Sequence, residues 1–462
     1  MRKVSGLLLA SERRAIAGLA SLYATRMLGL FMVLPVLALY AEELTGATPL
    51  LIGLALGIYG LTQALLQIPF GLLSDRFGRK PIIAVGLLLF LLGSVVAAGS
   101  ETIGGVIAGR CLQGSGAVAA AIMALLADQT REQVRTAAMA TIGLSIGVAF
   151  AVAMVLGPWL AAAFGLSAVF WFTALLAALG LAVLWKLVPP APRRLKHRDV
   201  GIDRQQLIGI FTRADLWRLD LSIFALHLVL MAIFVAVPFR LVEAGIGVER
   251  HGLTYLAIMA LAFVGMVPLV IIAEKRQHMK GMCLVAIAAI TVSLAGLAGF
   301  GGGWALFAWL LLFFTAFNLL EATLPSMLSK LAPAGAKGSA MGLYSTSQFL
   351  GAFIGGVMGG LLAQRWGLTA VFVGSAALAA VWWLLMLGMS PPPHLSSEVV
   401  SLGDEHQGDA LDTLMASFAD VAGVEDVLVV PEERVAYLKI DRRRLDEEAL
   451  ARLIRSGRQR GG

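Results

Sequence analysis

The stretch GLLSDRFGRKP, residues 71–81, decides how the rest of this chain folds. It places one carboxylate and three cations beside apolar runs at 50–73 and 82–99 that carry no charge. Apolar runs of about 20 residues are long enough to cross the hydrocarbon core of a bilayer, about 30 Å thick, as helices. The charged stretch is therefore predicted to be a very short loop between two membrane spans.

Composition excludes a soluble globular protein. The chain has 462 residues, of which 59% are hydrophobic and 14% are charged, and its mean hydropathy is +0.85. Ordinary soluble domains carry about 25% charged residues. The two cysteines, Cys111 and Cys283, both lie inside apolar runs, so neither a disulfide framework nor a thiolate metal site is predicted.

The net charge of +7 divides unevenly along the chain. Residues 395–462 hold 14 acidic and 9 basic side chains, so the positive excess belongs to the residues before them. Positive charge beside apolar spans sets the orientation of a membrane protein. The basic balance therefore indicates membrane topology, and a nucleic-acid partner is not expected.

Twelve apolar runs have the length of membrane spans, six on each side of a polar, basic segment. They lie at 15–40, 50–73, 82–99, 103–127, 137–163, 166–188, 216–242, 252–273, 281–300, 304–328, 339–363 and 368–389. We therefore predict an all-α membrane protein with 12 transmembrane helices. The predicted halves are residues 1–188 and 216–390, and a linker at 189–215 joins them.

The distribution of lysine and arginine predicts the orientation. Before residue 395, 22 of the Lys and Arg residues in the loops and at the adjoining span ends lie on one side, whereas the other side holds only Arg240, Arg250 and Arg365. Cytoplasmic loops carry the excess of Lys and Arg. Both termini and the linker are therefore predicted to be cytoplasmic.

The last part of the chain, residues 395–462, is polar and is predicted to form a small separate domain. Strands are expected at 398–402, 424–430 and 434–440, and helices at 409–419 and 446–456. This β-α-β-β-α order is half of a ferredoxin-like sandwich. Without a Cys or His pair it is not a metal-carrying version. We expect a small α+β ferredoxin-like cytoplasmic domain that binds a cytoplasmic ligand or self-associates.

The pattern G-x-L-x-D-R-x-G-R-K in the charged stretch resembles the signature loop of the major facilitator superfamily. The resemblance implies the major facilitator fold, with Asp75 near the positive end of a helix from the other half and Arg79 paired with Asp128. Such contacts can latch two halves together on the cytoplasmic side, and ordinary positive-inside charge is the alternative. The predicted latch comprises Gly71, Asp75, Arg76, Gly78, Arg79, Lys80, Asp128 and Arg135.

Arg110 lies well inside the fourth span, in the pattern R-x-x-Q-G-x-G. An intramembrane arginine is costly unless it is paired or hydrated. The spacing resembles a second motif of the superfamily, associated with proton-coupled members, which implies that Arg110 influences a protonatable partner. The alternative is that Arg110 bridges helices through carbonyl groups. Gly157-Pro158 in the fifth span resembles the centre of an antiporter motif whose flanking glycines are alanines here.

Three further ionisable residues lie deep in apolar runs: Arg26, His227 and Glu321. Glu321 is the only carboxylate well inside an apolar run, and Asn318 shares its helix face. A carboxylate and a histidine at such depth suit proton transfer. We predict proton coupling by Glu321, His227, Arg110 and Asp128. Structural pairing of Glu321 and a carbonyl bond from His227 are the alternatives.

Polar residues recur every fourth position in two spans. Tyr59, Gln63 and Gln67 form such a stripe in the second span, and Tyr344 and Gln348 repeat it in the eleventh. Stripes of this kind line a hydrated cavity or bond neighbouring helices. The predicted substrate cavity comprises Arg26, Tyr59, Gln63, Gln67, Gln113, Asn318, Tyr344 and Gln348.

The resemblance implies a proton-coupled secondary transporter that works by alternating access in the inner (plasma) membrane of a bacterium. We expect an antiporter that exports hydrophobic or amphipathic small molecules, driven by the proton gradient, with no cofactor, metal or nucleic acid. An importer or facilitator of a metabolite remains open because fold does not set direction. So does a membrane sensor whose C-terminal domain is the output. An enzyme is not expected, because the chain has no nucleotide-binding loop and no metal-spaced cluster.

Overall fold

The computed structural model describes residues 9–189, 213–275, 278–299, 302–332, 337–391, 395–401, 417–430, 435–441 and 444–459. Its first half contains α1 (Ala10–Met32), α2 (Leu34–Tyr40), η1 (Ala41–Glu43), α3 (Pro49–Phe77), α4 (Arg79–Ala98), α5 (Ile103–Ser115), α6 (Ala119–Gln129), α7 (Glu132–Phe164) and α8 (Leu166–Lys186). Its second half contains α10 (Ala214–Glu243), α11 (Val248–Lys275), α12 (Met279–Gly299), α13 (Gly303–Leu331), α14 (Lys337–Trp366) and α15 (Leu368–Leu387). We call these the N half and the C half.

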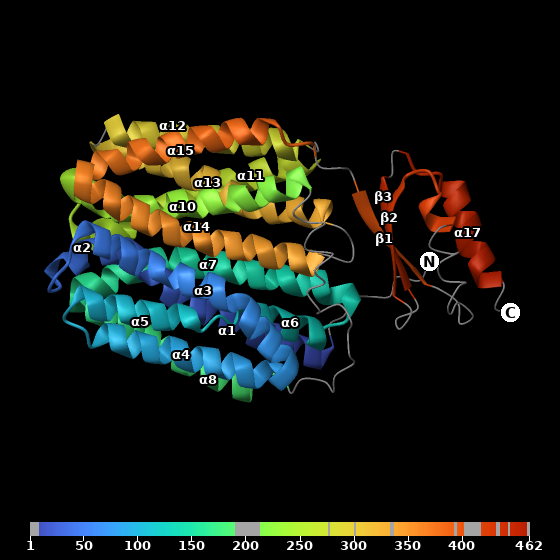
Figure 1. Ribbon diagram of the computed structural model, residues 1–462, viewed down its shortest axis with the longest axis horizontal. Helices are drawn as coiled ribbons and strands as arrows, with labels where there is room; N and C mark the ends of the chain where they lie inside the picture. The colour runs from blue at the N-terminus through green and yellow to red at the C-terminus, as the bar shows by residue number, and fades with distance from the viewer. Residues whose placement is uncertain are drawn as a thin grey trace.

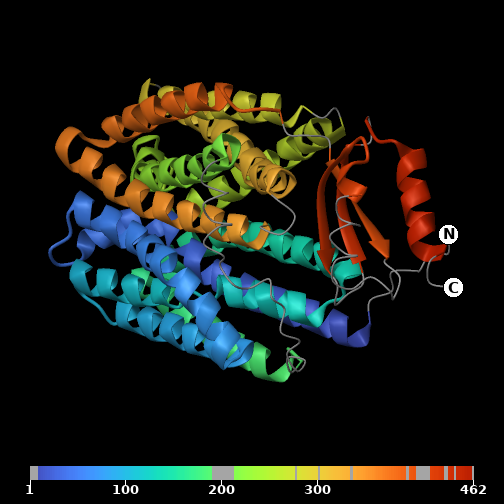
Figure 2. The same cartoon turned by 45° about the vertical axis from the view of Figure 1, so that its right-hand side comes forward.

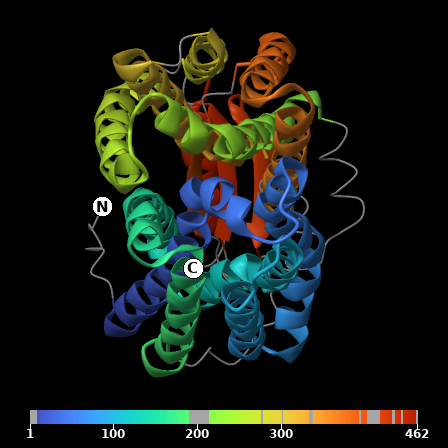
Figure 3. The same ribbon diagram turned by 90° about the vertical axis from the view of Figure 1, so that its left-hand side faces the viewer.

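Twelve helical segments of the described chain are long and apolar enough to cross a membrane, which confirms the predicted number of spans. Two of them are composite, because α1 continues into α2 and α5 into α6. Figure 1 shows the two halves lying side by side with their helices roughly parallel. Figure 3 views the same bundle from one end.

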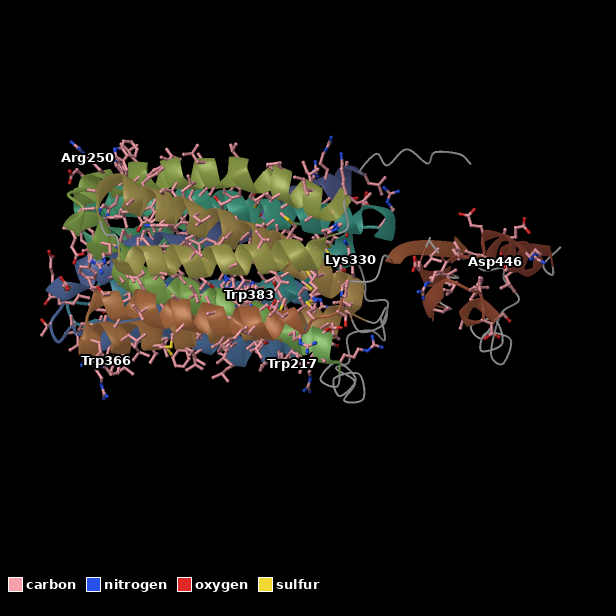
Figure 4. All side chains as sticks on the ribbon, turned by 90° about the horizontal axis from the view of Figure 1, so that it is seen from above. Trp217, Arg250, Lys330, Trp366, Trp383 and Asp446 are labelled. Atoms are coloured by element: carbon pink, nitrogen blue, oxygen red, sulfur yellow. The ribbon has the colours of Figure 1, made fainter. Side chains whose placement is uncertain are left out.

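The ends of the bundle differ from its middle in chemistry. Nitrogen and oxygen atoms gather at both ends, and carbon dominates between them (Figure 4). Exposed Trp217 and Trp366 lie toward opposite ends, as interfacial tryptophans do. We name the two ends of the bundle after residues that lie there, the Asp75 end and the Glu43 end.

The stretch at 71–81 is almost entirely helical, which corrects the expectation of a loop. Helix α3 runs to Phe77 and α4 starts at Arg79, so only Gly78 separates the two helices. Gly78 has φ 101°, a backbone conformation that residues with a Cβ atom rarely adopt. The charged side chains are therefore held on two helix ends rather than on a flexible connection.

Two spans are broken near the middle of the bundle. Val33 separates α1 from α2, where Pro35 removes a backbone donor. Gly116 ends α5, and α6 does not begin until Ala119. A Cβ atom on Gly116 would lie 2.2 Å from the carbonyl oxygen of Gly86 on α4, so only glycine allows these backbones to approach so closely. Neither break was expected from the sequence.

The halves meet along α3 and α14 through glycines. A Cβ atom on Gly53 would lie 2.2 Å from the carbonyl oxygen of Gly356, and one on Gly57 would lie 2.6 Å from that of Phe353. Leu50 N also donates to Gln364 Oε1 at 3.1 Å. Small residues let helices approach closely in membranes. These contacts hold the halves together from the Glu43 end to mid-bundle.

The buried cores show where the halves join. One cluster combines residues of the Glu43 end of the N half, such as Leu37 and Phe150, with the core of the C half, such as Phe234. A second cluster, which includes Leu87 and Leu125, consists of N-half residues toward the Asp75 end. Within the described residues, the buried core that combines both halves is therefore the one at the Glu43 end, and Phe349 of α14 packs against the edge of the second cluster.

The two halves repeat one lysine contact at the Asp75 end. Lys80 Nζ on α4 donates to the carbonyl oxygen of Val188 at 2.5 Å. Lys280 Nζ on α12 donates to that of Leu387 at 3.0 Å. Each lysine thus satisfies a carbonyl group at the end of the last helix of its own half. The repetition is typical of an internal duplication.

The C-terminal residues form a sheet with a helix. Strands β1 (Leu395–Ser401), β2 (Val424–Val430) and β3 (Val435–Asp441) pair antiparallel in the order β1-β3-β2. Helix α17 (Glu447–Gln459) follows them, and it lies beside the sheet in Figure 2. Phe418, Leu438 and Leu450 are among the residues of its small core. The predicted helix at 409–419 and the linker lie largely outside the described residues.

Replacing Gly356 by valine should destabilise the joined halves. Overpacking a tight contact costs about 1–3 kcal/mol, and a Cβ atom there would lie 2.4 Å from the carbonyl oxygen of Gly53. The matched control is Gly342→Val on the same helix, where a Cβ atom meets nothing within 4 Å. We expect the melting temperature of the purified protein to fall in Gly356→Val relative to the control. Equal melting temperatures would contradict the glycine contact.

Candidate functional site

The charged cluster at the Asp75 end ties three helices of the N half together. Arg79 forms an ion pair with Asp75, four residues earlier on α3. Its Nη1 donates to Ser74 Oγ at 2.7 Å, and its Nε donates to Asp128 Oδ2 at 3.2 Å, near the end of α6. The structure thus brings together the arginine and the carboxylate that the resemblance paired.

The other predicted latch residues surround this cluster. Arg76 lies over the ring of Phe77, with Cζ 5.4 Å from the ring centroid. Gly71 faces α6, since a Cβ atom there would lie 3.8 Å from the Cβ of Ala120. The side chain of Arg135 lies outside the described residues. Lys80 and Gly78 take the positions given above.

Asp75 forms no hydrogen bond or ion pair with the C half in the part of the chain that the structure describes. Its ion pair with Arg79 stays within the N half. The resemblance implied that this carboxylate lies near a helix end of the other half. The proximity of Asp75 to that helix end stays a prediction.

Arg26 fills the break between α5 and α6. Its Nη2 donates to the carbonyl oxygen of Gly116 at 3.1 Å, to Tyr59 Oη at 2.7 Å and to Gln63 Oε1 at 2.8 Å. The guanidinium is buried and also lies over the ring of Phe90. A carbonyl freed by a helix break needs a donor in a membrane. Arg26 supplies it and so couples the first, second and fourth spans.

Arg110 bridges helices, as the alternative interpretation held. Its Nε and Nη2 donate to the carbonyl oxygens of Ala55 and Leu56 at 3.3 and 3.4 Å. Its Nη1 donates to Gln113 Oε1 at 3.0 Å, and Gln113 donates in turn to Ser94 Oγ at 2.8 Å. Arg110 is fully buried. No carboxylate of the described residues pairs with it.

Three predicted residues meet in the middle of the C half. Gln348 Nε2 lies 2.8 Å from His227 Nε2 and donates to Glu321 Oε1 at 3.4 Å. His227 Nδ1 lies 3.2 Å from the carbonyl oxygen of Ile223, and its Nε2 lies 3.9 Å from Glu321 Oε2. The three side chains come from α10, α13 and α14. We call them the Glu321 cluster.

The hydrogen bonds of the Glu321 cluster fit a neutral imidazole. If Nδ1 carries the proton and donates to Ile223, then Nε2 is free to accept from the amide of Gln348. A second proton on Nε2 would replace that bond and turn the ring toward Glu321 as a cation. The Glu321 side chain is 40% exposed, whereas that of His227 is 14% exposed. The cluster therefore has two protonatable groups in contact, one of them open to solvent.

Sequence reasoning missed Asp220. This residue of α10 is 8% exposed, and its Oδ1 has no hydrogen-bond partner among the described residues. Glu321 is therefore not the only carboxylate inside a span. Asp215 and Arg218 lie close by in sequence, so Asp220 looked like part of a charged flank. Only its burial distinguishes it.

The remaining predicted cavity residues are buried polar groups. Gln67 and Tyr344 are 5% and 3% exposed. Gln67 Oε1, Tyr344 Oη and Asn318 Nδ2 have no partner among the described residues. Buried polar atoms without partners mark places where water or a ligand binds. The substrate role predicted for these residues stays a prediction.

A layer of aromatic rings joins the halves beside the Glu321 cluster. Phe31 and Phe150 of the N half contact each other edge to face, with ring centroids 5.0 Å apart. Phe150 stacks on Phe317 of the C half at 6.5 Å, and Phe317 lies 5.9 Å from His227. The Glu321 cluster is thus coupled by direct ring contact to the surface on which the halves meet. Within the described residues, no group of His, Cys, Asp or Glu is arranged to hold a metal ion.

Comparison with known proteins places this arrangement among transporters. The Major Facilitator Superfamily matches residues 19–356 and 317–425. The inner membrane transport protein YajR of Escherichia coli (strain K12) is 47% identical over 93% of this chain and 94% of its own length. The multidrug resistance protein MdtH of Aeromonas salmonicida (strain A449) is 27% identical over 72% of this chain and 84% of its own length.

A solved structure shows the same fold. A bacterial homologue of the human lysosomal transporter Spinster, in an inward-facing and occupied conformation, has a TM-score of 0.66 at 14% identity. The alignment covers 82% of this chain and 97% of that one. The family, the similarity to YajR and the fold all indicate membrane transport rather than enzymatic catalysis. The chain belongs to the major facilitator superfamily and is a multi-pass secondary transporter similar to YajR.

Proposed function

We propose that this protein is a proton-coupled antiporter that exports hydrophobic or amphipathic small molecules by alternating access. The observation that carries the proposal is the Glu321 cluster, where a partly exposed carboxylate lies beside a histidine in the middle of the membrane-spanning bundle. Intramembrane carboxylates and histidines are typical of proton pathways. The proton gradient is the only energy source in the proposal, and no cofactor takes part.

The proposed cell location is a bacterial inner membrane, with the Asp75 end and both termini in the cytoplasm. The cation bias of the loops supports this orientation. The name of YajR, an inner membrane transport protein, supports the membrane. In this orientation the observed arrangement, closed at the Glu43 end, corresponds to a carrier closed toward the outside. The name of MdtH, a multidrug resistance protein, supports export.

Coupling in this proposal acts through the contact surface between the halves. Protonation of the Glu321 cluster changes the charge beside Phe317, which stacks on Phe150 of the N half. A change of charge alters the electrostatic energy of a low-dielectric site far more than it would in water. The proton therefore shifts the balance between carriers open at one end and carriers open at the other. The cluster of Asp75, Arg79 and Asp128 stabilises the alternative state, in which the Asp75 ends meet.

The small C-terminal domain is proposed to be ferredoxin-like and regulatory. Its strand order β1-β3-β2, antiparallel throughout, supports a ferredoxin-like half-sandwich. A cytoplasmic ligand or a second copy of the domain is the proposed partner. In a sensor, by contrast, this domain would carry the output.

Glu321→Gln should abolish proton-driven transport while the protein still folds, because glutamine keeps the shape but cannot bind or release a proton. The measurement is dye accumulation in sealed everted vesicles under an imposed proton gradient. The matched control is Glu249→Gln, which makes the same substitution at the start of α11. Unchanged accumulation in Glu321→Gln would remove Glu321 from the mechanism.

Arg79→Gln should slow transport by removing the ion pairs to Asp75 and Asp128. We expect this variant to slow the conformational step that interconverts the two states of the carrier. The equilibrium affinity for substrate should therefore stay close to that of the wild type. Arg14→Gln is the matched control, because Arg14 is an exposed arginine at the same end of the N half. Initial rates and equilibrium binding of a transported dye test this. Equal transport rates in both variants would indicate that Arg79 contributes only the positive charge that sets membrane orientation.

Removal of residues 395–462 separates a transporter from a sensor. We expect the shortened protein to retain proton-driven flux, since the domain lies beyond the last helix of the bundle (Figure 1). Dye accumulation in everted vesicles is again the measurement, normalised to the amount of protein in the membrane. Complete loss of flux from a correctly inserted protein would favour the sensor.

A further inference from the structure

We propose that the break between α5 and α6 binds a small monovalent anion, for which chloride has the matching charge and size. The ligands of the anion are the unpaired N–H groups of Arg26, the side-chain amide of Gln63 and the first backbone N–H groups of α6. The site lies within the N half and takes no part in proton coupling. It therefore goes beyond the proposed function.

The N-terminus of α6 is buried and has no side-chain cap. Its N-cap residue, Val118, makes no side-chain cap hydrogen bond, and both Val118 and Ala121 are fully buried. The first N–H groups of an α-helix have no partner within that helix. Backbone groups without partners are costly inside a bilayer, where no water replaces the missing bond. The start of α6 therefore needs an acceptor from outside the helix.

A shared oxygen atom holds Arg26 beside this helix end. The carbonyl oxygen of Gly116 accepts from Arg26 Nη2 at 3.1 Å and from Val118 N at 2.9 Å. The guanidinium thus lies next to the residue that begins α6. A helix of 11 residues carries partial positive charge at its N-terminus. Two positive groups are therefore held close together, and an anion beside both would offset their repulsion.

The neighbours of Arg26 leave donor atoms unpaired. Arg26 is 1% exposed, yet its Nε and Nη1 have no hydrogen-bond partner among the described residues. Gln63 Oε1 accepts from Arg26 Nη2 at 2.8 Å, whereas Gln63 Nε2 has no partner in the same set of residues. All three unpaired atoms are donors. The group that satisfies them is therefore an acceptor.

The charge around the break favours an anion over water as that acceptor. Arg26 and Arg110 both contact Tyr59: Arg26 donates to its hydroxyl oxygen at 2.7 Å, and Arg110 Cζ lies 5.2 Å from its ring centroid. Neither guanidinium takes part in the ion pairs of the described residues. Buried charges without a counter-charge are costly. A water molecule leaves both positive charges uncompensated, whereas an anion offsets them.

Close packing around the break restricts the anion to a small one. A Cβ atom on Gly86 of α4 would lie 2.1 Å from Cγ1 of Val118, and the side chain of Gln63 is fully buried. Chloride is a single atom with one negative charge, so it needs little room. The enclosure also argues against the head group of an amphipathic substrate, because the apolar part of such a molecule would have to follow it into the packed N half.

Chloride itself is the probe for this site, and no transported substrate is needed. Purified full-length protein is titrated with radioactive chloride at constant ionic strength, with gluconate as the replacing anion. The melting temperature is recorded over the same series. A ligand that binds the folded state and not the unfolded state raises stability. We expect saturable binding of one ion per chain and a melting temperature that rises with chloride concentration.

Gln63→Glu tests the chemistry of the site without removing Arg26. The new carboxylate keeps the acceptor for Arg26 Nη2, removes the amide donor and supplies the missing negative charge. Chloride binding should weaken by at least about tenfold, the loss expected when charge-assisted hydrogen bonds are removed. The melting temperature of this variant should no longer depend on chloride. Replacement of a donor needed only for packing would not transfer the effect of the ion to the protein in this way.

Two arginine variants complete the test. Arg26→Gln should also weaken chloride binding by at least about tenfold, because it removes the charge and the unpaired donors together. Arg250→Gln makes the same substitution at an exposed arginine of the Glu43 end. It should bind chloride as the wild type does. If Arg26→Gln fails to fold, the comparison of Gln63→Glu with the wild type decides.

Three results would overturn the assignment. Absence of saturable chloride binding in the wild type would leave water as the ligand of the break. Full binding in Gln63→Glu would place the ion elsewhere on the chain. Displacement of chloride by a medium-chain carboxylate at similar concentration would assign the site to an amphipathic head group. Each result leaves proton-driven transport standing, because that activity is measured separately in vesicles.

Discussion

Hydrocarbon solvates neither a peptide group nor a charge, and this constraint governs the whole molecule. Every backbone donor and acceptor inside the membrane needs a partner within the protein. Long apolar helices provide these partners for most of the chain. Where a span breaks, as at Gly116, a side chain has to complete the bonding, and the guanidinium of Arg26 does so. Burying the charge of Arg26 is costly, but its guanidinium satisfies a carbonyl group that the break at Gly116 leaves without a helical partner.

Buried charges divide between the halves in opposite ways. Within its spans the N half buries two arginines, Arg26 and Arg110, which are bonded to carbonyl, amide and hydroxyl oxygens. Within its spans the C half holds two carboxylates, the buried Asp220 and the partly exposed Glu321, and the histidine of the Glu321 cluster. An arginine keeps its proton at all ordinary pH values, whereas carboxylates and histidine exchange theirs. In the N half, the buried carboxylate of Glu12 lies at the start of α1 and pairs with Arg131. The carboxylates and the histidine that lie deeper in the described spans belong to the C half, and the N half supplies a cationic scaffold.

Contact between the halves links that chemistry to motion. Glycines bring α3 and α14 into backbone contact, so the surface at the Glu43 end has little room to deform. Close-packed surfaces of this kind favour two discrete arrangements over continuous bending. The Phe150–Phe317 stack lies on this surface and contacts the histidine of the Glu321 cluster through Phe317. The cluster at Arg79 lies at the opposite end, where the described residues of the halves share no core.

The sequence by itself determined the number of spans, the two halves and the family, because hydrophobic length and the pattern at 71–81 are local properties of the chain. It also selected Glu321, His227 and Gln348, since polar residues in apolar runs are conspicuous. Only the tertiary structure decided which of these residues meet, because α10 is far in sequence from α13 and α14. It also revealed the break at Gly116 and the burial of Asp220. Both depend on what a neighbouring helix places against them, and no local pattern records that.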